Sequence, residues 1–85
     1  MTDENWKRRT LADLQTIFRE LFLDDNLNIS EQTSPADIDE WDSMAQVSLL
    51  TAVESKFGVH FTAEDMGHIS DVATLLAVLK ARGAQ

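Results

Sequence analysis

Apolar residues recur at three- and four-residue spacing in three segments of this chain, and this spacing limits the possible folds more than any other feature. In the first segment they are Trp6, Leu11, Leu14, Ile17, Phe18, Leu21 and Phe22. In the second and third they are Val47, Leu50, Val53 and Phe57, and then Val72, Leu75, Leu76 and Leu79. Such spacing gathers apolar side chains on one face of an α-helix. No segment alternates long enough to predict a strand, so we predict an all-α fold.

Residues at the segment ends indicate where the helices begin and end. Asp42 or Ser43 can cap the second helix, and Gly58 can end it in a left-handed conformation. Ser70 can cap the last helix, and a short helix precedes it. The predicted helices cover about residues 4–22, 42–57, 62–67 and 70–82.

A long loop over about residues 23–41 separates the first two predicted helices. It contains the only proline, Pro35, and three isolated apolar residues that we expect to pin it to the helices, namely Leu27, Ile29 and Ile38. We therefore predict one domain over residues 1–85, a four-helix bundle with one long loop and a short third helix.

The length and composition of the chain exclude several classes of protein. A chain of 85 residues buries a small core but no deep catalytic pocket, so we do not expect an enzyme. It has no cysteine, which excludes disulfides and thiolate metal sites. The first residues are polar and acidic, and no apolar run approaches the length of a membrane span. We therefore expect a cytoplasmic protein without a membrane partner.

The net charge of −8 is unevenly distributed along the chain. Between Glu20 and Ser55 there is no Lys or Arg. The carboxylates in this stretch are Glu20, Asp24, Asp25, Glu31, Asp37, Asp39, Glu40, Asp42 and Glu54. Such a surface repels nucleic acid and attracts basic protein surfaces, although acidic residues also serve simply to keep a small domain in solution.

The segment Asp42-Ser43-Met44 places a hydroxyl group at the first turn of the second predicted helix. A phosphate attached there would meet backbone N–H groups without intrahelical partners and the positive end of the helix dipole. The same residues also fit a plain helix cap in which Gln46 returns a hydrogen bond to Ser43. From these residues alone, the cap is the simpler interpretation.

A longer set of residues follows a pattern known from one protein family. The pattern covers about residues 8–80, and the residues that carry it are Asp42-Ser43-Met44, Val47, Leu50, Val53-Glu54, Phe57-Gly58-Val59, Phe61, Glu64-Asp65, Ile69-Ser70-Asp71-Val72 and Leu75-Leu76. In these residues the chain resembles the acyl carrier proteins. The resemblance implies that Ser43 receives 4′-phosphopantetheine from coenzyme A, and that the thiol of this covalent arm carries acyl groups as thioesters between enzymes.

The chain departs from the family pattern at several positions. Trp41 stands where a small residue is usual, and Met44 stands where leucine is usual. Ala45 and Ser48 stand where carriers of fatty acid synthesis often have acidic residues. These departures favour a carrier of a specialised pathway, such as polyketide or modified fatty acid synthesis. A peptidyl or aminoacyl carrier, or a carrier-like interaction module that is never modified, are the alternatives.

The resemblance and the charge together predict the partners. A phosphopantetheinyl transferase would load the arm with the help of Mg²⁺, because the chain itself offers no catalytic base. Acyl-loading and acyl-processing enzymes would present basic docking surfaces to a monomeric carrier. The residues expected to meet these partners are Asp39, Glu40, Trp41, Asp42, Met44, Glu54, Glu64 and Asp65. For Trp41 we favour a second interpretation, as an anchor that packs the loop onto the bundle.

Two weaker signals do not predict a metal site. Asp37 and Asp39 begin like a calcium loop, but Asp42 stands where that loop requires glycine. His60 and His68 are too far apart for a helical pair and lack neighbouring ligands. We expect no bound metal ion.

The sequence leaves open whether the cargo is sheltered inside the bundle. An acyl chain between the second and last helices would be lined by Val47, Leu50, Leu75 and Leu76. Short, polar or aminoacyl cargo would be expected to stay outside.

Overall fold

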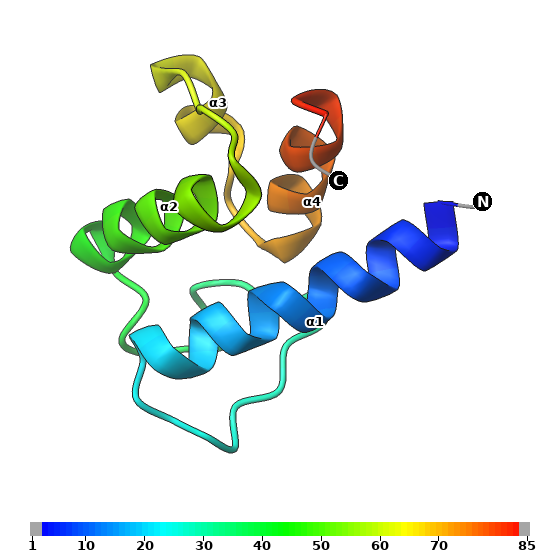
Figure 1. Ribbon diagram of the computed structural model, residues 1–85. Coiled ribbons are helices and arrows are strands. Elements are labelled where there is room, and N and C mark those ends of the chain that lie inside the picture. The colour runs from blue at the N-terminus through cyan, green and yellow to red at the C-terminus, as the bar shows by residue number, and fades with distance from the viewer. Residues whose placement is uncertain (1–2, 84–85) are drawn as a thin grey trace.

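The computed structural model describes residues 3–83 and contains helices in the predicted order (Figure 1). They are α1 (Asp3–Leu21), α2 (Ser43–Phe57), α3 (Ala63–His68) and α4 (Val72–Ala81). Residues 3–83 contain no strand. The predicted all-α, four-helix fold with a long loop and a short third helix is thus confirmed.

The start of α4 differs from the prediction because a different residue caps it. The Oδ1 atom of Asp71 accepts a hydrogen bond from the Thr74 N–H at 2.8 Å, and Thr74 Oγ1 accepts one from the Asp71 N–H at 2.9 Å. Asp71 is therefore the N-cap, and the prediction that Ser70 caps α4 is wrong. The end of α2 is as predicted, because Gly58 adopts a left-handed conformation with φ of 66°.

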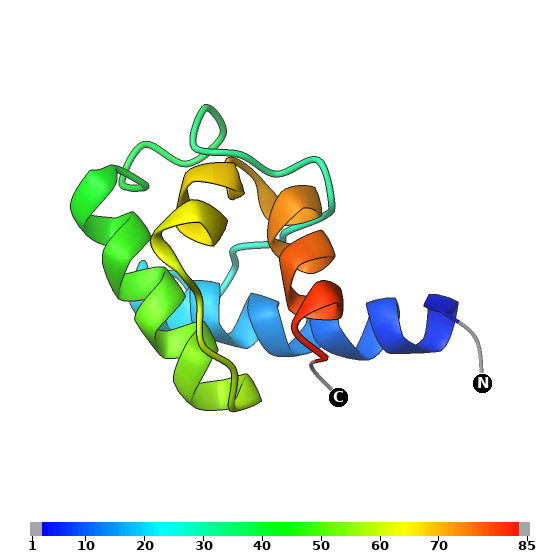
Figure 2. The ribbon, with the colours of Figure 1, turned by 90° about the horizontal axis from the view of Figure 1, so that it is seen from above.

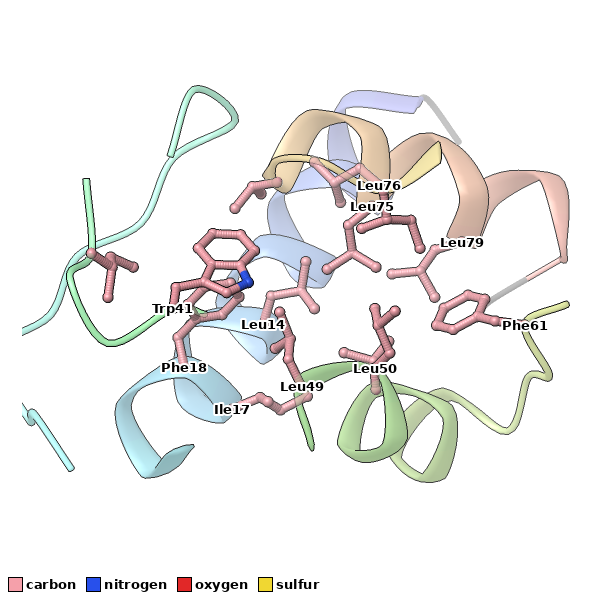
Figure 3. Close-up of a cluster of buried hydrophobic side chains, with 14 residues drawn as sticks. Leu14, Ile17, Phe18, Trp41, Leu49, Leu50, Phe61, Leu75, Leu76 and Leu79 are labelled. Carbon is pink, nitrogen blue, oxygen red and sulfur yellow. The ribbon is translucent and has the colours of Figure 1, made fainter. Parts of the chain in front are cut away.

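The helices enclose one hydrophobic core. In the view of Figure 1, α1 lies beneath α2 and α4, and α3 lies on the far side of them from α1; Figure 2 shows the same arrangement from above. The core contains side chains from every helix except α3, and several come from the connecting segments (Figure 3). Its buried apolar members are Leu14, Ile17, Phe18, Ile38, Trp41, Leu49, Leu50, Val53, Phe61, Ile69, Val72, Leu75, Leu76 and Leu79.

Side chains of α1 fasten the first half of the long connection. Arg19 Nε donates to the Leu27 carbonyl at 2.7 Å, and Gln15 Oε1 accepts from the Ile29 N–H at 3.0 Å. Leu27 and Ile29 pack against the core, and Ile38 is buried in it. The expectation that these three apolar residues pin the connection is confirmed.

Backbone carbonyls of the connection bind the first turn of α4. The Thr33 carbonyl accepts from the Val72 N–H, and the Glu31 carbonyl accepts from the Ala73 N–H, both at 3.0 Å. These N–H groups have no partner within their own helix, so the connection supplies the acceptors they need. The long connection is thereby held against both α1 and α4.

Core packing predicts that two substitutions differ greatly in their effect on the free energy of unfolding. Leu75 is 0% exposed and Met44 is 81% exposed. We expect Leu75→Ala to lower the free energy of unfolding by about 2–5 kcal/mol, because it leaves a cavity. Met44→Ala, the control, should change it by less than about 0.5 kcal/mol. Urea unfolding followed by circular dichroism measures both, and similar losses for the two variants would contradict this packing.

Candidate functional site

Ser43 is the first residue of α2, and its side chain is exposed. The N-cap is Asp42, whose backbone is extended and whose Oδ1 accepts from the Ala45 N–H at 2.9 Å. The interpretation of Ser43 as a cap paired with Gln46 is therefore wrong. The Ser43 hydroxyl lies at the helix start without being needed to cap it.

The first turn of α2 leaves backbone donors beside this hydroxyl. The Asp42 carbonyl accepts from the Gln46 N–H at 2.8 Å, and no hydrogen bond within residues 3–83 engages the N–H groups of Ser43 or Met44. The first turn also contains no acidic residue. These donors and the helix dipole favour an anion at Ser43, although the carboxylate of Asp42 reduces the effect.

A groove of about 480 Å³ opens next to Ser43. Its walls come from the long connection, the first turn of α2, α3 and the α3–α4 connection. The lining residues are Pro35, Trp41, Asp42, Ser43, Gln46, Met66, Ile69 and Ser70. A group attached to the Ser43 hydroxyl would therefore lie beside this groove.

Trp41 closes the core beneath the groove. It is 4% exposed and packs edge-on against Phe18, with ring centroids 5.2 Å apart (Figure 3). Its Nε1–H donates to Gln46 Oε1 at 2.6 Å, and Gln46 Nε2 donates to the Ile69 carbonyl at 3.0 Å. Trp41 is therefore an anchor of the long connection, the interpretation favoured from sequence, and its contact with partners stays a prediction.

Two apolar side chains of α2 lie on the surface near Ser43. Met44 is 81% exposed and Val47 is 65% exposed. The expectation that Val47 faces the interior is wrong, because its position on the helix turns it away from the core. Leu50, Leu75 and Leu76 are buried as expected, with 4% exposure or less.

The acidic residues expected to meet partners differ in what they contact. Asp39, Glu40 and Asp42 are exposed just before α2, and Glu64 is exposed in α3. The carboxylates of Asp39, Glu40 and Asp42 add to the negative charge just before Ser43 in the chain. Their role in recognition stays a prediction.

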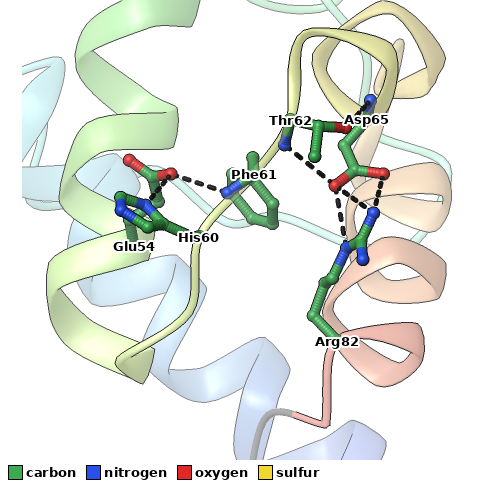
Figure 4. A network of polar contacts seen from close by, with 6 residues as sticks. All are labelled: Glu54, His60, Phe61, Thr62, Asp65 and Arg82. Carbon is green, nitrogen blue, oxygen red and sulfur yellow. Dashed lines mark hydrogen bonds and ion pairs between the residues drawn. The ribbon is translucent and has the colours of Figure 1, made fainter.

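Glu54, near the other end of α2, holds the segment that follows the helix. Its Oε2 accepts from the Phe61 N–H at 2.7 Å and lies 3.3 Å from His60 Nδ1 (Figure 4). The hydrogen bond from Phe61, and then the one from His60, keep the pKa of Glu54 below its ordinary value. Glu54 thus has a structural role besides the recognition role predicted for it.

Asp65 joins α3 to the end of α4. Its two carboxylate oxygens accept from Arg82 Nε and Nη2, each at 2.8 Å, and Oδ2 also accepts from the Thr62 N–H at 3.0 Å (Figure 4). The bonds from Arg82, followed by the bond from Thr62, lower the pKa of Asp65 from its ordinary 3.8 to about 2. This ion pair fixes α3, the helix that supplies Met66 to the groove.

Sequence reasoning did not identify Gln46 and Met66 as neighbours of Ser43 in a groove. Gln46 was assigned to a capping box, and Met66 carried no signal. One signal could have identified Gln46, because a buried tryptophan requires an acceptor for its N–H and Gln46 is a nearby side chain able to provide one.

Two further features of residues 3–83 bear on the predictions. Among them, no three His, Cys, Asp or Glu side chains are grouped as they would be around a metal ion. None of the helices they form is both long enough and apolar enough to cross a membrane.

Comparison with solved structures finds a similar protein. The solution NMR structure of a holo acyl carrier protein from Geobacter metallireducens matches with a TM-score of 0.79 and 30% sequence identity. The match covers 86% of this chain and 84% of that one. No protein-family model matches the chain, and no curated protein does.

The Asp65–Arg82 pair predicts a specific loss of stability in acid. A carboxylate whose pKa is lower in the folded state stabilises the fold above its unfolded pKa, and this contribution is lost as the pH falls. For Asp65 the loss should occur between about pH 4 and pH 2, as its pKa falls on folding from 3.8 to about 2. The melting temperature of Asp65→Asn should therefore fall less between pH 5 and pH 2.5 than that of the wild type.

The control for this experiment is Asp25→Asn, which removes an exposed carboxylate in the long connection with the same change in charge. It should keep the acid sensitivity of the wild type. An equal fall in melting temperature for Asp65→Asn and the wild type would show that the ion pair does not stabilise the fold.

Proposed function

Because the chain belongs to the acyl carrier protein family, we propose that it carries acyl intermediates as thioesters on a 4′-phosphopantetheine arm attached to Ser43. The observation that carries this proposal is the exposed hydroxyl of Ser43 at the first position of α2, beside a groove. When bound, the arm supplies the thiol that holds the acyl group. The chain itself is a carrier and not a catalyst.

The residues around Ser43 fit such an arm. The N–H groups of Ser43 and Met44 can donate to a phosphate diester on the hydroxyl. The exposure of Ser43 gives a modifying enzyme access to the oxygen. The groove offers a surface of mixed polarity for the part of the arm beyond the phosphate.

Activation of the Ser43 hydroxyl must come from the modifying enzyme. A serine hydroxyl is a weak nucleophile without a base. The nearest carboxylate in sequence, Asp42, already accepts a hydrogen bond from the Ala45 N–H. A phosphopantetheinyl transferase with bound Mg²⁺ would therefore supply the base and neutralise the phosphate.

The surface of α2 favours service in a specialised pathway. Ala45 and the exposed Ser48 leave the first turns of α2 without the acidic residues often found in carriers of fatty acid synthesis. Enzymes that dock on such a surface would contact fewer negative charges on α2 and more on the loop before it. Polyketide or modified fatty acid synthesis fits this pattern.

The first test of the proposal measures modification at Ser43. Incubation with coenzyme A, Mg²⁺ and a broad-specificity phosphopantetheinyl transferase should add one phosphopantetheine group to the wild type and none to Ser43→Ala. Intact-mass spectrometry measures the addition. Because Asp42 is the cap, Ser43→Ala should change the free energy of unfolding by less than about 0.5 kcal/mol.

Ser48→Ala is the matched control, since Ser48 is another exposed serine of α2. It should be modified like the wild type. If the wild type gains no mass with several transferases, the chain is better described as an interaction module that is never modified.

A second test addresses recognition by charge. Asp39 and Glu40 are exposed immediately before α2, and exposed charges act over about 8–10 Å at physiological ionic strength. Replacing them together, by Asp39→Asn and Glu40→Gln, should lower kcat/KM for the transferase by about threefold to tenfold at low salt. The difference should shrink at high salt, while helix content stays unchanged.

A double variant of α1, Glu4→Gln with Asp13→Asn, makes the same change in charge away from Ser43. Its kinetics should stay close to those of the wild type. If both double variants slow the reaction equally, only the net charge matters and the acidic loop is not a recognition site.

A further inference from the structure

Gln46 lines the groove beside Ser43 and is hydrogen-bonded to two residues of the core. It lies three residues after Ser43 on α2 and lines the same groove. Its side-chain amide accepts from Trp41 Nε1 at 2.6 Å and donates to the Ile69 carbonyl at 3.0 Å. The amide therefore joins Trp41, which lies two residues before α2, to the α3–α4 connection.

The residues on both sides of this amide belong to the packed core. Trp41 and Ile69 are each 4% exposed, and they belong to the same buried cluster as Leu50, which is 2% exposed, and Leu75, which is 0% exposed. A chain that started at Ser43 and entered the bundle here would have to break both hydrogen bonds of Gln46. It would also have to separate side chains that already fill the space.

The groove outside this barrier presents both polar and apolar groups. A glutamine amide has two N–H donors and an oxygen with two lone pairs, and the bridge uses one of each. The exposed Ser70 adds a hydroxyl group, and Pro35 and Met66 add apolar surface. This mixture suits a short acyl group that carries oxygen or nitrogen atoms.

We propose that Gln46 determines the class of cargo: its bridge closes the bundle beside Ser43, excludes long alkyl chains from the core, and keeps short or polar acyl groups in the groove. This inference rests on the proposed attachment at Ser43. The sequence leaves open whether the cargo lies inside or outside the bundle, and this proposal makes the Gln46 side chain the group that decides it.

The test uses the absence of cysteine from the chain. The variant Ser43→Cys provides a single thiol, which methyl or octyl methanethiosulfonate converts to a mixed disulfide without any transferase. With Gln46 present, the octyl adduct should melt within about 1 °C of the methyl adduct, because the chain stays outside the core and only touches the open groove. With Gln46→Ala in addition, the octyl adduct should melt at least about 4 °C above the methyl adduct, because several methylenes become buried.

Each comparison is made within one background, so a general loss of stability in Gln46→Ala cancels. If that variant does not fold, Gln46→Glu serves instead, since it keeps the acceptor for Trp41 Nε1 and removes the donor to Ile69. Gln32→Ala, at an exposed glutamine of the long connection, is the control and should behave like the parent.

A second measurement locates the octyl chain. In ¹⁵N-labelled protein with Gln46 present, the octyl adduct should shift the amide resonances of Met66 and Ser70 relative to the methyl adduct and leave that of Leu75 unchanged. Removal of the Gln46 amide should shift the Leu75 resonance as well. An octyl chain that stabilises the protein equally with and without Gln46, or in neither case, would overturn the proposal.

The two proposals fail separately. The disulfide adducts form by chemical reaction, so they report on the Gln46 bridge even if no transferase modifies Ser43. Absence of phosphopantetheine from the wild type in the mass measurement would refute the attachment and leave the result on the bridge intact.

Discussion

The buried indole of Trp41 is the contact on which the arrangement around Ser43 depends. Its ring packs edge-on against Phe18 of α1, an interaction of about 0.5–1.5 kcal/mol beyond the burial of area. Its N–H binds Gln46 of α2, which in turn binds the carbonyl of Ile69. Trp41 thus ties the long connection directly to α1 and α2, and through Gln46 to the α3–α4 connection.

The acidic residues of this chain divide into two kinds, and the division explains how a small fold tolerates so much negative charge. Glu54 accepts a hydrogen bond from the Phe61 N–H, and Asp65 accepts hydrogen bonds from Arg82. Together they hold the segment that runs from α2 through α3 to the end of α4. Asp39, Glu40 and Glu64 are exposed. These exposed carboxylates can pair with a basic surface of a partner, and the pairing breaks no contact inside the fold.

The sequence predicted the helices well because their signals are local. Period, caps and terminators lie within a few residues of one another, so the order of the helices and the burial of Leu50, Leu75 and Leu76 followed directly. For α2 the sequence allowed either Asp42 or Ser43 as the cap, and the structure selects Asp42. For α4 the predicted cap, Ser70, lies one residue before the actual cap, Asp71, because serine and aspartate can both cap a helix. The half of the Gln46 bridge that reaches Ile69 was missed because it joins residues far apart in the chain, and no local pattern encodes such a contact. The half that binds Trp41 is local, and only the need of a buried indole for an acceptor indicates it.

The carbonyls of Glu31 and Thr33 that bind the first turn of α4 also bear on how the chain folds and opens. An isolated helix of this length is marginal in water, and its start is completed here by a segment that lies before α2 in the sequence. Figure 2 shows the connection passing over the start of α4. Closing the intervening loop costs entropy before these bonds can form. The connection and α4 therefore behave as one cooperative unit, so that a fluctuation which lifts residues 31–33 also frays the helix farthest from them in the chain.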